Sequence, residues 1–200
     1  GKPTLLSSML GDGRLWGLVA ANILSMTAYS LWTNWTTVFL VSSTGLSQQE
    51  ANLRFAWIPP IFAALGGMAG GALSLRFAAG VTLFQARYRV CRIAGFALLA
   101  TCLTPLLPGA AWATVAICWS FFWSVAFSVN VYALPLDFFG AGRAAFGVSA
   151  LTSAYGLMQS VLSPLIGLGI DLYGFVPVCV LAGLMPLAGV GVLKWTGKRQ

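Results

Sequence analysis

The feature that most constrains this chain is a set of long stretches without any charged side chain. Five stretches contain no Lys, Arg, Asp or Glu: residues 15–49, 55–75, 93–136, 144–170 and 172–193. A helix that crosses a bilayer needs roughly 20 predominantly apolar residues. Each stretch can hold one such helix, and the third can hold two. Only 8% of the residues are charged, against roughly a quarter in soluble domains, so the sequence predicts an all-α membrane protein.

Turn signals and charges set the limits of the predicted helices. The segment Thr104-Pro105-Leu106-Leu107-Pro108-Gly109 divides the longest stretch, because Pro and Gly favour a turn. We therefore expect a six-helix transmembrane bundle over residues 15–196, with spans at about 15–41, 48–76, 90–107, 110–135, 144–170 and 173–195. Residues 1–14 form a cytoplasmic lead-in and residues 197–200 a cytoplasmic tail.

The basic residues are distributed unequally between the two sides of this bundle. Six spans place both chain ends on one side, which then carries Lys2, Arg14, Arg76, Arg87, Arg89, Arg92, Arg143, Lys194, Lys198 and Arg199. The other side carries only Arg54. Cytoplasmic loops are enriched in Lys and Arg, so we expect both termini to face the cytoplasm. The net charge of +7 therefore reflects orientation in a membrane, and no nucleic-acid partner is expected.

The residue types that carry most catalysis and metal binding are scarce. The chain has no His, four acidic residues, and four Cys without close spacing. Isolated Cys residues in apolar segments most often serve as small packing residues. We therefore predict no catalytic site, no metal site and no cofactor, and the chain is not expected to be an enzyme.

The start of the second span combines a helix-capping pattern with the only basic residue of its side. Ser47 and Glu50 have the spacing of a capping box, in which each side chain bonds the other residue's backbone N–H. Arg54 follows Glu50 by four residues, so the two can pair on one helix face. Two interpretations of Arg54 remain open at this point: an interfacial ion pair, or part of an external gate for anions.

Two prolines and four glycines mark the second span. Pro59 and Pro60 lack a backbone N–H and clash with the carbonyl four residues earlier, so a kink is expected. Two overlapping pairs of glycines with four-residue spacing follow: Gly66 with Gly70, and Gly67 with Gly71. Such pairs let another helix approach closely. The predicted structural or gating positions of this span are therefore Pro59, Pro60, Gly70 and Gly71.

Uncharged polar or aromatic side chains recur on one face of three predicted spans. These faces are Asn22, Ser25, Tyr29, Thr33 and Thr36 on the first span, Trp119, Trp123, Ala126 and Asn130 on the fourth, and Ser149, Thr152, Ser153, Gly156, Gln159, Ser160 and Ser163 on the fifth. Two explanations are open: Ser and Thr can bond the backbone of their own helix, or the faces line a shared wet cavity. An unpaired amide in hydrocarbon is costly, so Gln159 and Asn130 favour the cavity.

Several motifs, in order along nearly the whole chain, resemble the C-terminal half of a major facilitator superfamily transporter. The end of the eleventh helix of that fold is similar to SPLIGLGIDLYG (163–174), and the connection before that helix to LPLDFFGAGRAAFGVSA (134–150). The anion:cation symporter family, which includes hexuronate and galactonate transporters, is similar to YSLWTNWTTVFLVSSTGLSQQEA (29–51) and LGGMAGGALSLRF (65–77). One position departs from the superfamily, because Leu75 stands where an acid is expected before Arg76.

The resemblance implies a fold of two six-helix halves with substrate bound between them. This half would supply neutral groups to the cavity, namely Tyr29, Trp32, Thr33, Asn34, Trp123, Asn130, Ser153 and Gln159. Arg143 would precede the eleventh helix of the fold. Asp171 would end it beside the turn glycine Gly174, since Asp171 lies about 18 Å of helical rise beyond Gln159 and hence near the interface.

By resemblance, the expected function is secondary active transport of small organic anions, sugar acids in particular, by alternating access. The implied partners are the anion, a coupling proton or other cation, the lipid bilayer of a bacterial inner membrane, and an N-terminal six-helix half in the same or a separate chain. Two alternatives remain open: a half-transporter that associates with itself, and a membrane scaffold or truncated remnant that does not transport.

Overall fold

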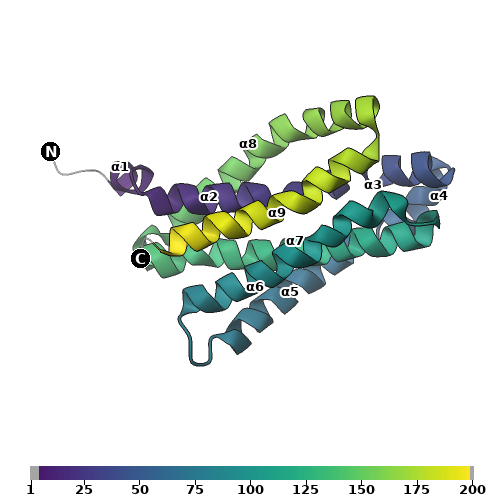
Figure 1. Cartoon of the computed structure of the whole chain (residues 1–200). Coiled ribbons are helices and arrows are strands. Elements are labelled where there is room, and N and C mark those ends of the chain that lie inside the picture. Colours follow the sequence, from purple (N-terminus) through teal and green to yellow (C-terminus); the bar gives the residue numbers. More distant parts are fainter. Residues whose placement is uncertain (1–4, 199–200) are drawn as a thin grey trace.

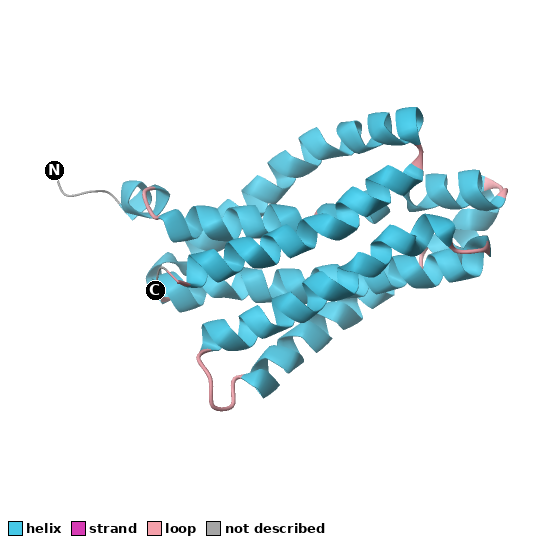
Figure 2. Cartoon of the chain, in the orientation of Figure 1, coloured by secondary structure: helices cyan, strands magenta, loops and turns pink. Residues whose placement is uncertain are grey.

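Six membrane-length helical segments form one bundle in the computed structural model, which describes residues 5–198 (Figures 1 and 2). The segments are Gly13–Thr44, Gln48–Phe77, Leu83–Leu106, Gly109–Phe139, Ala141–Tyr173 and Phe175–Gly197. A short helix, α1 (Leu5–Leu10), precedes them, and the described residues contain no strand. The predicted all-α, six-span fold is confirmed, and the chain is an integral membrane protein. Lys2 and Arg199 lie outside the described residues.

The first span consists of two helices, α2 (Gly13–Ser25) and α3 (Thr27–Thr44), joined at Met26. The side chains of Ser25 and Thr27 each donate a hydrogen bond to the backbone carbonyl three residues earlier, at 2.9 and 3.0 Å. Such hydroxyls compete with the backbone ladder of a helix. This competition accounts for an interruption that the apolar pattern does not predict.

The second span changes helix type before its prolines. It begins as α4 (Gln48–Ala51), continues as the π-helix η1 (Asn52–Ala56) and resumes as α5 (Pro59–Phe77). Pro59 and Pro60 occupy the first positions of α5, where a missing N–H is tolerated. The expected distortion is therefore a break immediately before the two prolines, and not a kink within a continuous helix.

The predicted capping box is present at the start of α4. The Oγ of Ser47 accepts from the N–H of Glu50 at 3.2 Å, and the Oε2 of Glu50 accepts from the N–H of Ser47 at 3.1 Å. The predicted ion pair between Arg54 and Glu50 also forms, at 4.0 Å between exposed side chains. An exposed pair of this kind contributes about 0–1 kcal/mol, and the guanidinium of Arg54 stays accessible.

The third span starts earlier than its apolar segment predicts. It consists of α6 (Leu83–Ala97) and the 3₁₀-helix η2 (Leu98–Leu106). The Oγ1 of Thr82 caps α6 by accepting from the N–H of Gln85 at 3.2 Å. A capped first turn lets the helix continue beyond the apolar residues. The helix therefore begins at Leu83 and not near residue 90, so Arg87 and Arg89 belong to the helix and not to the loop before it.

Single glycines join the last three spans. The helices α7 (Gly109–Phe139), α8 (Ala141–Tyr173) and α9 (Phe175–Gly197) are separated by Gly140 and Gly174 alone. The φ angles of these glycines are 72° and 77°, a left-handed backbone that glycine adopts without strain. The predicted turn glycine at position 174 therefore serves that purpose.

The helix α7 lies at the centre of the bundle and contacts α2, α3, α5, α6 and α8. Helix α2 begins at the same end of the bundle at which α9 finishes (Figure 1). The second and fifth spans are the most exposed, since 22% and 17% of their apolar cores are buried, against 67% for the first span. Helices α5 and α8 therefore present most of their surface outward.

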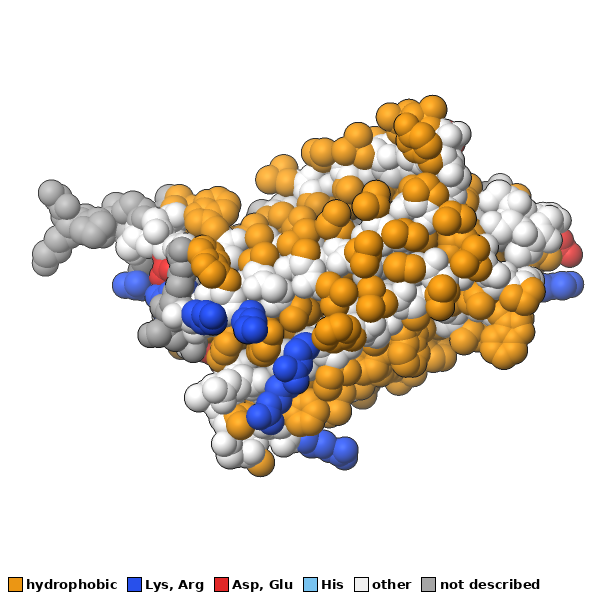
Figure 3. Space-filling view, in the orientation of Figure 1, with side chains coloured by type: hydrophobic (Ala, Val, Ile, Leu, Met, Phe, Trp, Pro, Cys, Tyr) orange, Lys and Arg blue, Asp and Glu red, His pale blue; other side chains and the backbone are white. Residues whose placement is uncertain are grey.

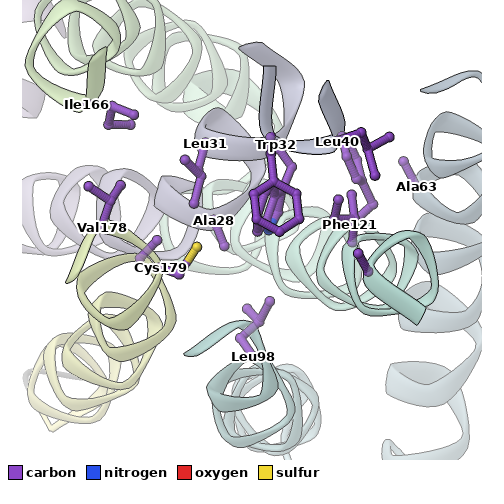
Figure 4. Close-up of a cluster of buried hydrophobic side chains, with 14 of the residues drawn as sticks. Ala28, Leu31, Trp32, Leu40, Ala63, Leu98, Phe121, Ile166, Val178 and Cys179 are labelled. Carbon is purple, nitrogen blue, oxygen red and sulfur yellow. The ribbon is translucent and has the colours of Figure 1, made fainter. Parts of the chain in front are cut away.

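Two clusters of buried apolar side chains fill the bundle. One surrounds Trp32, whose indole packs edge-on against Phe39 at a centroid separation of 5.3 Å. Figure 4 shows Trp32 in the middle of this cluster, with Phe121 of α7 on one side and Cys179 of α9 on the other. The second cluster includes Leu18 of α2 and is nearer the end where α2 begins.

The helices α5 and α7 approach closely at two glycines. A Cβ at Gly70 would lie 2.7 Å from the Cα of Ala126, and a Cβ at Gly66 would overlap the backbone of Phe122. The Nδ2 of Asn130 donates to the carbonyl oxygen of Gly70 at 3.1 Å across this contact. One of the two predicted glycine pairs therefore forms a helix–helix contact.

Replacing Gly70 by alanine is expected to destabilise the bundle, because the added methyl group meets the backbone of α7. Overpacking of this kind costs about 1–3 kcal/mol. The matched control is Gly71→Ala, whose methyl group would have no atom within 4 Å. Thermal unfolding in detergent, followed by circular dichroism, should show a lower Tm for Gly70→Ala only; equal Tm values would contradict the close contact.

Two ion pairs lie at the end of the bundle where α2 begins. The Nε of Arg87 on α6 donates to the Oδ2 of Asp137 on α7 at 2.6 Å, and the two side chains are 21% and 9% exposed. The guanidinium of Arg14 donates to the carboxylate of Asp12 at 2.7 Å and lies 5.3 Å from the ring centroid of Phe139. The hydrogen bond from Arg14 lowers the pKa of Asp12.

The Arg87→Gln substitution is expected to destabilise the protein more than Arg54→Gln. It leaves the nearly buried Asp137 carboxylate without its partner, at a cost between the ~1 kcal/mol of an exposed pair and the ~3–5 kcal/mol of a buried one. Arg54 loses only an exposed contact of 4.0 Å. Denaturant titration of both variants in the same detergent measures the difference, and a larger loss for Arg54→Gln would refute the assignment.

Candidate functional site

A cavity with polar walls lies between α3, η1 and α5. Its volume is about 220 Å³. It is lined by Tyr29, Trp32, Thr33, Asn34, Thr36 and Thr37 of α3, Ala56 of η1, Pro59 and Pro60 of α5, and Phe121 of α7. None of these side chains is charged, so recognition in this cavity depends on hydrogen bonds and on contact with aromatic rings.

The interruptions of the first two spans position this cavity. Because α3 starts anew after Met26, the predicted polar face divides: Asn22 and Ser25 of α2 are fully buried, whereas Thr33 of α3 is exposed. On the opposite wall, the π-helix η1 gives way to α5 at Pro59. Single π-helical turns are frequent at functional sites. The cavity thus forms where two helices depart from regular α geometry.

Two amides supply hydrogen-bonding groups at this site. The Nδ2 of Asn34 donates to the carbonyl of Ser30 at 3.1 Å, and its Oδ1 has no partner among the described residues. The Oγ1 of Thr37 donates to the Oδ1 of Asn52 at 2.8 Å, which joins α3 to η1. The Nδ2 of Asn52, which is thereby tied to Thr37 in the cavity wall, has no partner among the described residues.

Aromatic rings form the inner wall. Tyr29 packs edge-on against Phe121, with centroids 5.0 Å apart and an interplanar angle of 71°. The indole of Trp32 is 1% exposed, and its Nε1 has no hydrogen-bond acceptor among the described residues. Rings held in this way offer a rigid apolar surface at low entropic cost.

Four of the eight predicted substrate residues line the cavity: Tyr29, Trp32, Thr33 and Asn34, together with the predicted gating prolines Pro59 and Pro60. The other four predicted substrate residues do not line it: Trp123, Asn130, Ser153 and Gln159. The polar residues that line this cavity therefore come from α3, and those of the predicted faces on α7 and α8 lie elsewhere.

Gln159 reaches the cavity indirectly. Its Oε1 accepts a hydrogen bond from the hydroxyl of Ser30, which joins α8 to α3. The backbone carbonyl of Ser30 in turn accepts from Asn34, a residue of the cavity wall. Gln159 is thus placed to fix the position of the helix that carries the cavity residues.

The remaining predicted substrate residues have different surroundings. Asn130 is 1% exposed and bonds the backbone of α5 and of its own helix. Trp123 is half-buried and packs edge-on against Trp119, with centroids 5.7 Å apart. Ser153 is exposed on α8. A substrate role for these residues stays a prediction.

The other predicted gating positions lie at helix ends or on open surfaces. Arg143 is exposed in the first turn of α8, and Asp171 is exposed in its last turn. Asp171 is therefore at the helix end, as its distance from Gln159 predicts. Gly71 faces open space, whereas Gly70 lies in the contact with α7.

Sequence reasoning missed several residues of the site. Thr37 follows Thr33 by four residues, so the polar face could have been extended to it. Asn52, Ala56 and Phe121 belong to other elements and show no periodic pattern that connects them with α3. Only the packing of the helices brings Ala56 and Phe121 to the cavity and Asn52 to Thr37 in its wall.

Two larger cavities have apolar walls. One of about 480 Å³ lies between α8, α9 and the junction of α2 and α3, and one of about 380 Å³ lies between η1, α5 and α7. Thr27, in the wall of the first, already uses its hydroxyl to bond a backbone carbonyl. Within residues 5–198, no three or more His, Cys, Asp or Glu side chains gather as metal ligands. The polar cavity is therefore the better candidate for binding a polar solute.

A cysteine at position 33 is expected to react with a membrane-impermeant thiol reagent, because Thr33 is exposed and lines the polar cavity. The control is Leu31→Cys on the same helix, since Leu31 is 0% exposed. Both variants are made after the four native cysteines have been replaced by alanine. Mass spectrometry of the labelled protein in vesicles measures the reaction, and equal labelling at positions 31 and 33 would show that the cavity is not the accessible face.

No family model matches the chain. Two curated proteins are similar to it: the hexuronate transporters of Escherichia coli (strain K12) and of Escherichia coli O157:H7, each 25% identical over 197 residues. The matched region covers 98% of this chain and 45% of each relative. The chain thus spans about half the length of the curated relatives it matches, and both relatives are named as transporters, not as enzymes. The resemblance to a half of a hexuronate-type transporter is thereby confirmed.

Proposed function

We propose that this chain is one half of a secondary active transporter for small organic anions of the sugar-acid class. The observation that carries the proposal is the polar, uncharged cavity between α3, η1 and α5, in a chain similar over 98% of its length to hexuronate transporters. In this proposal Thr33, Asn34 and Tyr29 bond hydroxyl and carboxylate groups of the substrate. Trp32 and Phe121 support the apolar faces of its ring.

The mechanism follows from the position of these groups. Substrate binds between this half and an N-terminal six-helix half, and rocking of the two halves exposes the site to each side in turn. Because no charge lines the cavity, the positive charge that balances the carboxylate, and the residue that couples transport to a proton or other cation, come from the second half. The outward surfaces of α5 and α8 suit contact with such a second body, since little of these spans is buried.

Proteoliposomes test the half-transporter proposal. We expect no proton-driven uptake of labelled glucuronate or galacturonate by this chain alone, and uptake when the chain is joined to its N-terminal half. Uptake by the chain alone, with dimers detected by crosslinking, would instead support the self-associating alternative. Absence of uptake by the joined halves, with both inserted and folded, would favour the scaffold alternative.

Within the joined transporter, Thr33→Val is expected to lower the affinity for hexuronate by about tenfold, since a hydrogen bond to a charged group such as the carboxylate contributes about 1.5 kcal/mol or more. The matched control is Thr44→Val at the end of α3, because the Oγ1 of Thr44 is bonded to the carbonyl of Leu40 on its own helix. Concentration-dependent uptake measures KM for both. Equal KM values for Thr33→Val and the control would remove Thr33 from the substrate site.

A further inference from the structure

One end of the bundle carries cationic side chains without acidic partners. Four of them, on α6, on α9 and directly after α9, are exposed and form no ion pair within residues 5–198: Arg89, Arg92, Lys194 and Lys198. The two acidic residues at this end are already engaged, since Asp12 binds Arg14 and Asp137 binds Arg87. In the part of the chain that the structure describes, no acidic side chain therefore compensates the charge of these four side chains. Figure 3 shows Lys and Arg side chains gathered at this end, over the last turns of α9 and over α6.

Arg92 and Lys194 lie at the same depth on adjoining helices. The helices α6 and α9 pack antiparallel. A Cβ placed on Gly95 of α6 would lie 2.7 Å from the Cγ2 of Val190 on α9, and the earlier residue Phe84 of α6 lies against the later residue Gly197 of α9. Arg92 is three residues from Gly95, and Lys194 is four residues from Val190, in each case towards the same end of the bundle. Two cations on neighbouring helices therefore flank one crossing.

This depth matches the boundary between hydrocarbon and headgroups. Lys194 lies about 29 Å of helical rise from the start of α9 at Phe175, and the hydrocarbon core of a bilayer is about 30 Å thick. One turn deeper than Arg89 and Arg92, α6 exposes the apolar side chains Ile93 and Phe96, at 41% and 59%. The cations lie nearer the end of the bundle and the apolar side chains lie deeper, which matches the order of phosphate and acyl chain in a phospholipid.

We propose that Arg92 and Lys194 form a binding site for the headgroup of an anionic phospholipid. The guanidinium of Arg92 donates hydrogen bonds to the phosphodiester oxygens, a geometry that suits its planar fork, and Lys194 adds a point charge from α9. The first acyl-chain carbons lie along Phe96. Gly191, one turn deeper than Lys194, has no atom within 4 Å of a Cβ placed on it, which leaves room beside the chain. The bound lipid thereby joins α6 to α9 at the end of the bundle.

Native mass spectrometry of the purified chain, titrated with phosphatidylglycerol or phosphatidylcholine, tests the site. In this site each of the two cations contacts the phosphodiester, so removing one is expected to change binding about fivefold, on the order of the effect of one charge at an anionic membrane surface, whereas a charge away from the phosphodiester has a smaller effect. The double variant Arg92→Gln/Lys194→Gln is therefore expected to weaken phosphatidylglycerol binding by about 25-fold and to leave phosphatidylcholine binding unchanged. The matched control is Arg76→Gln/Arg143→Gln, which removes two exposed charges from α5 and α8, and it should change binding less than twofold.

Several outcomes would overturn the proposal. Equal losses in the two double variants would mean diffuse attraction and no site between α6 and α9. Equal binding of the two lipids by the unmodified chain would exclude headgroup recognition. Release of phosphatidylglycerol by millimolar inorganic phosphate would assign the site to free phosphate. If the double variant loses its helical circular dichroism, Lys194→Arg and Arg92→Gln replace it: the first should retain binding and the second should weaken it about fivefold, and any other pair of results counts against the site.

Discussion

The absence of water in the bilayer interior is the constraint on which this structure depends. Every backbone N–H and carbonyl group in the hydrocarbon must find a partner inside the protein. Long helices satisfy most of these groups, and polar side chains satisfy the places where a helix is interrupted. Ser25 and Thr27 do so at the junction of α2 and α3, and Asn130 bonds a carbonyl of α5 across the close contact of α5 with α7.

The same constraint explains where the polar cavity is found. A side chain whose hydroxyl already bonds its own helix, such as Thr114 with the carbonyl of Ala110, can be tolerated in hydrocarbon without further partners. Among the described residues, the amide oxygen of Asn34 in the cavity wall and the amide nitrogen of Asn52, which bonds Thr37 of that wall, have no partner. Such groups are stable only where water or a polar solute can reach. The interruptions of the first two spans provide such a position, and the continuous helix α7 packs against α3, η1 and α5.

Residues identified by a local pattern were predicted well. The capping box of Ser47 and Glu50, the contact at Gly70 and the turn at Gly174 follow from spacing or from a special backbone conformation, and each is present. Polar residues identified by helical periodicity were harder to place. One hydrophilic stripe was expected to run from Asn22 to Thr36, but the break at Met26 buries its first part against other helices. Periodicity assumes a continuous helix, so it cannot describe the two sides of a break.

By itself, the sequence determined the number of membrane spans, their approximate limits and the clustering of basic residues at one end, because these depend on runs of residue types along the chain. The tertiary structure decided which polar residues meet. The cost of an unpaired amide in hydrocarbon favours a cavity position for Asn130, but in the structure its amide bonds Gly70, which lies 60 residues away. Phe121 and Asn52 join the neighbourhood of Thr33 only because α7 and η1 pack beside α3. The energy of such contacts depends on the packing of distant segments, and no local pattern in the chain encodes it.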